Sequence, residues 1–495
     1  MGGSTDVVLV GVAQRTVREE DPLAAPTPLD LLEDVCREAA RDAGPGAGLL
    51  DAVDTVALVE SLGWHTRNAP RLLCERLGIR ARRELTSVLG GESPLALLNH
   101  LAREIAAGRA RVALLAGAHN LYSLLRARRR GLRLPLETGG DGEPERLGRR
   151  RDGHSPEEGR YGLDRPLHIY PFFESAVRAR RGLEPEAHRA RLGRLMSPFT
   201  EVAARNPHAW FPMARSPREL VEATPENRMV AEPYTKYLNA VMETDQAAAV
   251  LLLAQDAAAA FGIPEERRVW WWGGGGAVEE PWFFSEREDL SRSPALGFAG
   301  RAALVEAGVD LEEVGRFDLY SCFPVAVEMA CDELGLREDD PRGFTVTGGL
   351  PYAGGPGNDY CTHALAAMVE HLRADPSRSG LVTGNGWYFT KHAASVLGGA
   401  PRRDGGAPPP PAPPGKPVEL AEEAVGRGRI EAYTVVHDRE APRRGIVAGR
   451  LEDGRRFLAN TPDDRSLLEA FASGEQVGRA GRVEHRDGLN RFHPA

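Results

Sequence analysis

The sequence predicts an α/β protein with two duplicated halves, followed by a small β-barrel domain. Three observations lead to this prediction. Strand-like and helix-like segments alternate over residues 1–400, as they do in α/β folds. A strand, a Gly-Gly loop, a helix and a second strand follow one another in the same order twice. A segment rich in proline and glycine then separates this region from several short β-like runs.

The chain begins with elements that are typical of an α/β unit. The segment "DVVLVGVAQ" predicts a strand from residue 6. The segment "TPLDLLEDVCREAARDAG" has the apolar spacing of an amphipathic helix, with Thr27 as its N-cap and Gly44 at its end. The apolar run "VDTVALVES" predicts the next strand.

Two longer segments repeat one pattern. They are "ELTSVLGGESPLALLNHLAREIAAGRARVALLAGAHN" and "GFTVTGGLPYAGGPGNDYCTHALAAMVEHLRADPSRSGLVTGNGWY", with a glycine pair at Gly90-Gly91 and at Gly348-Gly349. Each predicts a strand, a loop, a long helix and a strand that ends in a glycine-containing turn. Two complete units in the same order indicate a duplication. We therefore assign residues 1–120 and 234–275 to an N-terminal half, and residues 276–400 to a C-terminal half.

Residues 121–233 separate the two parts of the first half. They look irregular and rich in arginine, as in "LLRARRRGLRLP", and we expect a loop insertion over the active face. The arginine clusters at 126–133 and 146–151 either bind phosphate groups of a ligand or stay solvated. The segment from Met242 to Gly262 then predicts a strand and a helix that close the first half.

Residues 401–417, "PRRDGGAPPPPAPPGKP", predict an extended and solvated linker. Residues 418–495 contain several β-like runs, punctuated by the turn dipeptides Asp453-Gly454 and Asp487-Gly488, and one short helix in "DDRSLLEAFASG". Short strands with one helix are typical of a small barrel such as an OB-like fold.

Composition excludes several classes of function. The net charge of −9 argues against a nucleic-acid-binding protein, which needs a basic face. The five cysteines form no CxxC pair, so we expect neither a disulfide framework nor a metal site. The N-terminal segment lacks the pattern of a secretory signal, and no apolar run is long enough to span a membrane. We expect a cytoplasmic protein.

Four segments together identify a family resemblance: "PYTKYLNAVMETDQAAAVLLL", "DLYSCFPVAVEMACDELGL", "TGGLPYAGGPGNDY" and "GLVTGNGWYFTKHA". They resemble the thiolase superfamily, and most closely its type-1 thiolase-like proteins, which are near the sterol-carrier-protein-linked thiolases. The resemblance covers about residues 1–400. It implies a five-layer αβαβα fold of two related halves, and the group's additional C-terminal OB-like domain fits residues 418–495.

The resemblance also implies where catalytic groups should lie, and this chain departs from it at each place. Counting back from Gly108, the position of the nucleophilic cysteine is Gly91, and Ser93 keeps a small polar residue nearby. The histidine of the family's Gly-His-Pro triplet is replaced by Gly355. The second cysteine belongs to a turn that here reads Thr383-Gly384-Asn385. Glycine has no side chain for acyl or proton transfer, so the chemistry of a thiolase is absent.

Other polar groups remain on the same loops. We predict Tyr352, His392, Tyr320 and Asn385 as catalytic candidates. The predicted pocket residues are Gly91, Ser93, Gly349, Gly355, Asn358 and Thr383. Each has a structural alternative: the two tyrosines could be packing residues with a bonded hydroxyl, and His392 could cap a helix. Cys361 and Cys322 are better explained as buried thiols. The run Trp270–Trp272 is buried on one face, and its other face is either buried or free to stack on a ligand.

Two functions follow from the resemblance. The first is an acyl-CoA enzyme of lipid metabolism, acting like an acetyl-CoA acetyltransferase or as an aldolase without a cysteine nucleophile. The second is a non-catalytic acyl-CoA-binding scaffold that recruits a protein partner through its OB-like domain. We expect no cofactor beyond the CoA thioester itself, and either a homodimer or a monomer. The glycines at positions 91 and 355 favour the scaffold, whereas the retained polar residues favour the enzyme. Of the two, we predict the enzyme, with the scaffold as the alternative.

Overall fold

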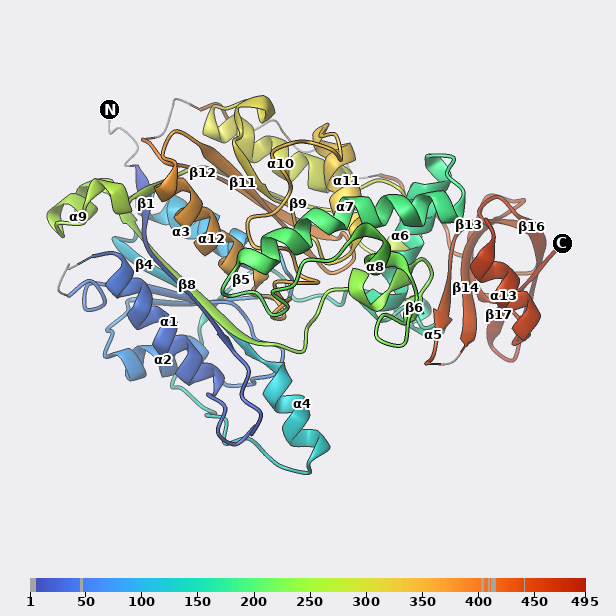
Figure 1. Cartoon of the computed structure of the whole chain (residues 1–495), viewed down its shortest axis with the longest axis horizontal. Coiled ribbons are helices and arrows are strands. Elements are labelled where there is room, and N and C mark those ends of the chain that lie inside the picture. The colour runs from blue at the N-terminus through green and yellow to red at the C-terminus, as the bar shows by residue number, and fades with distance from the viewer. Residues whose placement is uncertain (1–5, 45–47, 402–404, 408–409, 411–414, 440) are drawn as a thin grey trace.

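The computed structural model describes residues 6–44, 48–401, 405–407, 410, 415–439 and 441–495, which form two β-sheets. Ten strands make the first sheet, in the order β10-β11-β12-β9-β1-β8-β4-β2-β3-β5. Seven strands make the second, in the order β14-β15-β17-β16-β13-β6-β7. Figure 1 shows an elongated molecule with the first sheet and its helices in a large body, and the second sheet at the end that carries the C-terminus.

The first sheet contains the predicted duplication. The N-terminal half supplies β1 (Val7–Val17), β2 (Thr55–Leu58), β3 (Arg83–Ser87), β4 (Val112–Asn120) and β8 (Asp245–Ala254). The C-terminal half supplies β9 (Val269–Val278), β10 (Arg316–Asp318), β11 (Ser379–Gly386) and β12 (Lys391–Gly398). It therefore begins by residue 269 and not at the predicted residue 276, because β9 is one continuous strand that pairs with β12. In the N-terminal half β2 pairs in parallel with β4, and β8 pairs antiparallel with both β4 and β1. In the C-terminal half β10 likewise pairs in parallel with β11, and β12 pairs antiparallel with both β11 and β9. The two halves meet where β1 pairs antiparallel with β9.

Helices complete five layers. The helices α1 (Pro28–Asp42) and α2 (Ala69–Leu77) belong to the N-terminal half, and α1 packs on β1, β4 and β8. The helices α10 (Pro294–Ala307) and α11 (Pro324–Leu334) belong to the C-terminal half, where α10 packs on β9 and β12. Between them lie α3 (Ser93–Ala106) and α12 (Tyr360–Ala374), which contact each other and strands of both halves. This is the αβαβα arrangement that the resemblance implies.

The glycine run of β9 allows this close layering. A Cβ atom at Gly275 would lie 1.9 Å from the carbonyl oxygen of Ala299 in α10, and one at Gly274 would lie 2.1 Å from Oδ1 of Asn99 in α3. Glycine is therefore needed on both faces of the strand. The preceding tryptophans, Trp270–Trp272, are all buried. Both faces of this run are therefore buried, and neither is free to stack on a ligand.

The insertion at 121–233 is not the irregular loop that we expected. It forms five helices among its described residues: α4 (Leu121–Arg129), α5 (Pro156–Arg160), α6 (Pro166–Arg180), α7 (Pro185–Arg205) and α8 (Pro217–Val221). It also contributes the short strands β5 (Glu145–Leu147) and β6 (Met229–Ala231), and β7 (Tyr234–Thr235) follows it. Helices α6 and α7 pack against α11 of the C-terminal half. The segment from Met242 to Gly262 forms β8 and α9 (Gln255–Ala260), as predicted.

The C-terminal region forms a closed five-stranded barrel. Its strands are β13 (Gly426–His437), β14 (Pro442–Leu451), β15 (Arg456–Asn460), β16 (Ala480–Arg486) and β17 (Leu489–Pro494), and α13 (Arg465–Ser473) lies beside them. The barrel closes because β13 pairs with both β14 and β16. Phe457, Phe471 and Phe492 fill its core. This confirms the predicted barrel domain.

The barrel is attached firmly to the insertion. The guanidinium group of Arg178 in α6 is buried and donates to the Tyr433 hydroxyl at 2.8 Å and to Glu475 at 2.9 Å. Strand β6 also extends the barrel sheet through Ala231, which pairs with Val436. Much of the predicted linker at 401–417 lies outside the described residues. Within the described part of the chain, no helix is both long and apolar enough to cross a membrane.

Candidate functional site

The two glycine loops meet at the ends of the central helices. The side chain of Asn358, in the second loop, accepts a hydrogen bond from the backbone N–H of Gly90 at 2.9 Å. Its amide also donates to the carbonyl oxygen of Glu60 at 2.8 Å. Gly90 and Gly348 have φ values of +149° and +109°, which glycine adopts most readily. Asn358 therefore joins the two halves at the site, a structural role that the sequence did not reveal.

Gly91 faces Tyr320, and the phenol leaves no space for a side chain at position 91. A Cβ atom on Gly91 would lie 2.0 Å from the Tyr320 hydroxyl oxygen and 2.7 Å from the carbonyl oxygen of Asn385. Real Cβ atoms do not approach other atoms so closely. The volume of the missing cysteine is thus filled by the tyrosine of the other half.

The ring of Tyr320 is held on several sides. Its backbone N–H donates to Oγ1 of Thr383 at 3.0 Å, and its ring packs edge-to-face on Tyr360 at a centroid distance of 5.6 Å. Burial raises the pKa of Tyr320 well above its usual value. The phenol is therefore protonated at neutral pH, and it could donate a hydrogen bond to a ligand.

Asn385 contacts the insertion. Its amide nitrogen donates to the hydroxyl of Tyr170 at 2.9 Å, and that hydroxyl donates to the carbonyl oxygen of Trp387 at 2.8 Å. The ring of Tyr170 stacks on Phe323 at a centroid distance of 4.4 Å. Among the described residues, the buried Oδ1 atom of Asn385 has no hydrogen-bond partner. Tyr170 thus closes one side of the site, and sequence analysis missed it.

His392 lies on β12 and is buried. Its Nε2 atom lies 3.2 Å from Oγ of Ser293, which in turn donates to Glu279 at 2.8 Å. Its ring stacks on Phe389. Burial lowers the pKa of His392 to about 3, so the imidazole is neutral at physiological pH. Because a general base is most efficient when its pKa is near the working pH, this histidine is poorly tuned for that role in the closed site.

Four of the predicted residues line one small cavity. Tyr320, Thr383, Asn385 and His392 all border it, and its volume is about 10 Å³. A cavity must offer about 10–15 Å³ to hold a single water molecule. The site therefore brings these four residues together but has no room for a thioester in this state.

Comparison with solved structures gives the family. The crystal structure of a monomeric SCP2-thiolase like protein type 1 (STLP1) from Mycobacterium smegmatis aligns with 100% of this chain and 100% of its own, at 33% sequence identity and a TM-score of 0.85. The chain belongs to the SCP2-thiolase-like protein type 1 family. A family model described as the thiolase-like protein type 1 additional C-terminal domain also matches residues 413–488.

A second solved structure shares the thiolase-like fold. The Ltp2-ChsH2(DUF35) aldolase aligns with 79% of this chain and 97% of its own, at 17% identity and a TM-score of 0.61. This likeness concerns the fold alone. Among proteins with curated descriptions, no match was found.

Tyr352 of this type 1 thiolase-like protein lies apart from the small cavity. Its backbone carbonyl accepts from the N–H of Phe211 in the insertion at 2.8 Å, and it does not line the cavity. Its hydroxyl is buried and has no hydrogen-bond partner among the described residues. Burial raises its pKa above the usual value of tyrosine. The structure thus does not bring Tyr352 together with Tyr320, Asn385 and His392.

The remaining predicted residues have packing roles. The Ser93 hydroxyl donates to the carbonyl oxygen of Val88 at 2.6 Å. A Cβ atom at Gly349 would meet Oγ of Ser321 at 2.5 Å, so glycine is required there too. A Cβ atom at Gly355, the position of the missing histidine, would meet its nearest neighbours only at 3.4 Å. Unlike the space beside Gly91, the space beside Gly355 is not filled by a neighbouring side chain.

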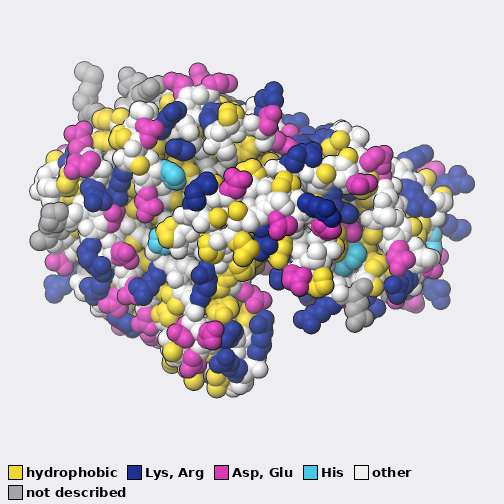
Figure 2. All heavy atoms as spheres, in the orientation of Figure 1, with side chains coloured by type: hydrophobic (Ala, Val, Ile, Leu, Met, Phe, Trp, Pro, Cys, Tyr) yellow, Lys and Arg dark blue, Asp and Glu magenta, His cyan; other side chains and the backbone are white. Residues whose placement is uncertain are grey.

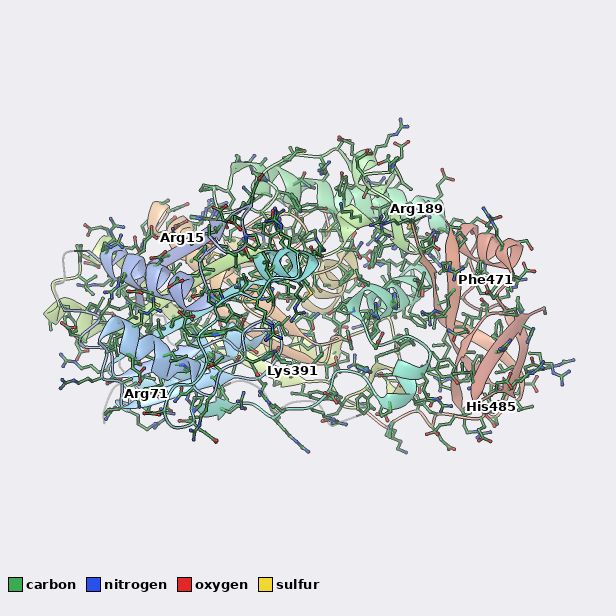
Figure 3. All side chains as sticks on the ribbon, turned by 90° about the horizontal axis from the view of Figure 1, so that it is seen from below. Arg15, Arg71, Arg189, Lys391, Phe471 and His485 are labelled. Atoms are coloured by element: carbon green, nitrogen blue, oxygen red, sulfur yellow. The ribbon has the colours of Figure 1, made fainter. Side chains whose placement is uncertain are left out.

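A buried ion pair borders the loop of Gly90. Nζ of Lys391 lies 2.7 Å from Oε1 of Glu92 and also donates to the carbonyl oxygen of Leu89 at 2.6 Å. The two side chains are 10% and 8% exposed. Figure 3 shows Lys391 near the middle of the α/β body, far from Phe471 in the barrel. Burial raises the pKa of Glu92, and Lys391 opposes that shift. Sequence analysis missed Glu92, although it adjoins Gly91.

Cys361 is the thiol at this site. Its Sγ atom lies 3.1 Å from the carbonyl oxygen of Gly91. Burial raises its pKa well above that of a free thiol, and the carboxylates of Asp318, Glu92 and Asp359 raise it further. A nucleophilic cysteine needs a lowered pKa. The structure therefore supports the buried-thiol interpretation of Cys361.

A second polar cluster lies between the insertion and the C-terminal half. Nε2 of His188 lies 2.6 Å from Oε1 of Glu174, and these two residues and Glu328 have possible ligand atoms within 4.8 Å of one another. The guanidinium groups of Arg181 and Arg191 pair with Glu328. Because the cluster contains its own cations, we interpret it as an ion-pair network that holds α6, α7 and α11 together.

Proposed function

We propose that this chain is a thiolase-like scaffold that binds acyl-CoA thioesters without the covalent chemistry of a thiolase. The observation that carries the proposal is the phenol of Tyr320 in the space beside Gly91. A thiolase must place a cysteine thiolate there, and this chain places a ring that excludes any side chain. The loss of the nucleophile is built into the packing of the site.

The other groups at the site support a non-covalent role. Cys361 is a buried thiol whose pKa is raised, and His392 has a pKa lowered to about 3. Neither group is tuned to take or deliver a proton near neutral pH. The cavity of about 10 Å³ must widen before an acyl group can enter. We propose no cofactor other than the CoA thioester itself.

We propose that the barrel binds a protein partner. The solved aldolase of similar fold pairs Ltp2 with ChsH2(DUF35), and a barrel fused to the chain would favour assembly with further components. The solved type 1 relative is monomeric, and we propose that this chain is also a monomer until it meets such a partner.

A second candidate function is an acyltransferase or aldolase reaction without a cysteine nucleophile, within lipid metabolism. The observation that favours it is the convergence of Tyr320, Asn385 and His392 on one cavity. Oδ1 of Asn385 is also buried without a partner among the described residues. Such an atom is available to a ligand group, because a buried polar atom is unfavourable when it is unpaired. After opening, a protonated phenol could polarise a carbonyl.

One experiment separates the two functions. The purified chain is incubated with acetyl-CoA, acetoacetyl-CoA and a β-hydroxyacyl-CoA, while CoA release and product masses are followed and binding is measured by calorimetry. Saturable binding without turnover supports the scaffold, and turnover on any substrate supports the enzyme. Absence of both binding and turnover refutes both functions.

Two matched variants locate any turnover. Tyr320→Phe removes the hydroxyl of a residue that borders the cavity, and Tyr352→Phe removes the buried hydroxyl of a residue that does not. Turnover that falls only in Tyr320→Phe assigns the chemistry to the cavity. Equal turnover in wild type and Tyr320→Phe removes Tyr320 from the mechanism.

A further inference from the structure

A much larger cavity lies outside the candidate site. Its volume is about 900 Å³, which is within the range of small-molecule sites. It is bordered by α7, by residues 338–346 and by α12, and it shares no lining residue with the small cavity. Both α7 and α12 lie on the face that Figure 1 turns to the viewer. In the same orientation, Figure 2 shows hydrophobic, cationic and acidic side chains mixed on this face.

The cavity has an apolar floor. One side is a stripe along α7, where Leu195, Phe199 and Val202 line the cavity at helical spacing. Phe317 and Phe344 continue the apolar surface on the C-terminal half. A floor of aromatic and aliphatic side chains is suited to hydrocarbon, because it removes apolar area from water.

Arg191 and Arg342, which line the cavity, are paired with carboxylates, whereas among the described residues three other lining arginines are not. Arg194, Arg205 and Arg316 line it, and within the described part of the chain none of them forms a hydrogen bond or an ion pair through its guanidinium group. Arg194 and Arg205 are eleven residues apart in α7, which separates them by about 16 Å along the helix axis. Free guanidinium groups beside an apolar floor are ready to bind an anionic group.

The acidic residues at the cavity are mostly neutralised. Glu338 pairs with Arg181 and Arg191, and Asp340 pairs with Arg342. Asp339, also in the lining, pairs with Arg337. Among the described lining residues, Glu370 is the carboxylate without an ion-pair partner. Three unpaired arginines against one unpaired carboxylate leave an excess of positive charge.

We propose that this cavity binds an anionic amphiphile, with its hydrocarbon chain on the floor around Phe199, Phe317 and Phe344. Its carboxylate or phosphate head group is bound by one of the unpaired arginines of the rim, Arg194, Arg205 or Arg316. The cavity uses none of the residues of the candidate site, so the proposal stands apart from the proposed function. It assigns this protein a second, surface-accessible ligand site.

Calorimetry on the full chain tests the chemistry of the ligand. The probes are dodecanoate, dodecyl phosphate, dodecanol and acetate, all below the concentration at which they form micelles. We expect saturable binding of dodecanoate or dodecyl phosphate, and the stronger of the two identifies the head group. Dodecanol should bind about tenfold more weakly, because it lacks one charge-assisted interaction. Equal binding of dodecanoate, dodecyl phosphate and dodecanol, or no saturable binding of either anion, overturns the proposal.

Variants locate the site. Arg194→Glu, Arg205→Glu and Arg316→Glu reverse the charge at the rim, and Val202→Asp places a carboxylate on the apolar floor. The matched control is Arg128→Glu, an exposed arginine on α4 without an ion-pair partner among the described residues. We expect Val202→Asp and at least one rim reversal to weaken binding about tenfold, and the control to leave it unchanged.

Two results would contradict this location. One is unchanged affinity in all three rim reversals and in Val202→Asp, with folding confirmed by circular dichroism. The other is competition between dodecanoate and saturating acetyl-CoA, which would merge this cavity with the CoA site. Independent binding of the two ligands, or dodecanoate binding without any CoA binding, keeps the two proposals separate.

Discussion

The phenol of Tyr320 occupies the space into which a side chain at Gly91 would project. The hydroxyl oxygen would lie 2.0 Å from a Cβ atom on that glycine. The two residues belong to different halves of the duplicated fold, and their sizes depend on each other. A tyrosine at position 320 requires glycine at position 91, and the pair closes the site where a thiolase holds its nucleophile.

Gly91→Ala should destabilise the protein by about 1–3 kcal/mol, because the new methyl group overpacks a closed site. Gly355→Ala is the matched control, since its Cβ atom would make only contacts of 3.4 Å or more. Neither glycine has a positive φ. The control should be neutral or more stable by about 0.4–1 kcal/mol. Denaturant unfolding measures both, and a Gly91→Ala variant as stable as wild type contradicts the packing described for Tyr320.

Lys391→Met should destabilise the protein by about 3–5 kcal/mol, because it leaves the buried Glu92 carboxylate without its cation. Burial raises the pKa of Glu92 and Lys391 lowers it, so the variant raises that pKa further. A carboxyl group with a raised pKa favours the folded state when protonated. The loss should therefore be larger at pH 8 than at pH 5. Adding Glu92→Gln to the variant should restore much of the stability, and a loss independent of pH argues against a charged Glu92.

His119→Asn should destabilise the protein more at pH 7 than at pH 5. Burial lowers the pKa of His119 to about 4, whereas the unfolded chain binds a proton near pH 6.5. The stability from the neutral ring is therefore complete above pH 6.5 and is lost as pH falls towards 4. The loss of unfolding free energy caused by His119→Asn should be up to about 2 kcal/mol larger at pH 7 than at pH 5. Urea unfolding of both proteins measures it, and a constant difference excludes a buried neutral histidine.

Arg456→Met should loosen the barrel from the α/β body. The buried guanidinium group of Arg456 donates to the carbonyl oxygens of Ser285 at 2.9 Å and Glu288 at 3.2 Å, and it pairs with Glu431. Losing these bonds should destabilise the attachment by about 2–4 kcal/mol. The weaker attachment should be detected as faster limited proteolysis between residues 400 and 418. It should also appear as a separate unfolding transition of the barrel. Arg455→Met is the neighbouring control, because that arginine forms an exposed pair with Asp453. Similar behaviour of the two variants contradicts the role given to Arg456.

The duplication and the barrel could be predicted because their signals are local. Each half has its own glycine pair, helix and apolar strand, and the barrel has short strands between turn dipeptides. The insertion, in contrast, is rich in arginine, as in "LLRARRRGLRLP", and this composition predicts an irregular loop. The structure has helices there, and α6 and α7 each contain an internal proline, Pro171 and Pro198, which weakens the helical pattern of the sequence. Frequent arginines also make the apolar spacing of these helices difficult to recognise in the sequence.

The site could be predicted only in part, because its contacts join distant segments. Tyr320, Thr383, Asn385 and His392 do meet at one cavity. Tyr170 reaches Asn385 across 215 residues of sequence, and no pattern in the chain indicates this contact. Tyr352 is on the predicted loop, but the insertion covers it. The presence of a residue on a loop does not determine the direction of its side chain.

The most direct test of the closed site is a thiolysis assay combined with intact mass spectrometry. The protein is mixed with acetoacetyl-CoA and CoA, the loss of acetoacetyl-CoA is followed, and the protein mass is then measured. We predict no thiolysis and no acyl adduct, because Gly91 offers no thiol and Cys361 is buried and protonated. Thiolysis that disappears in Cys361→Ala, or an acyl group found on Cys361, would contradict the account.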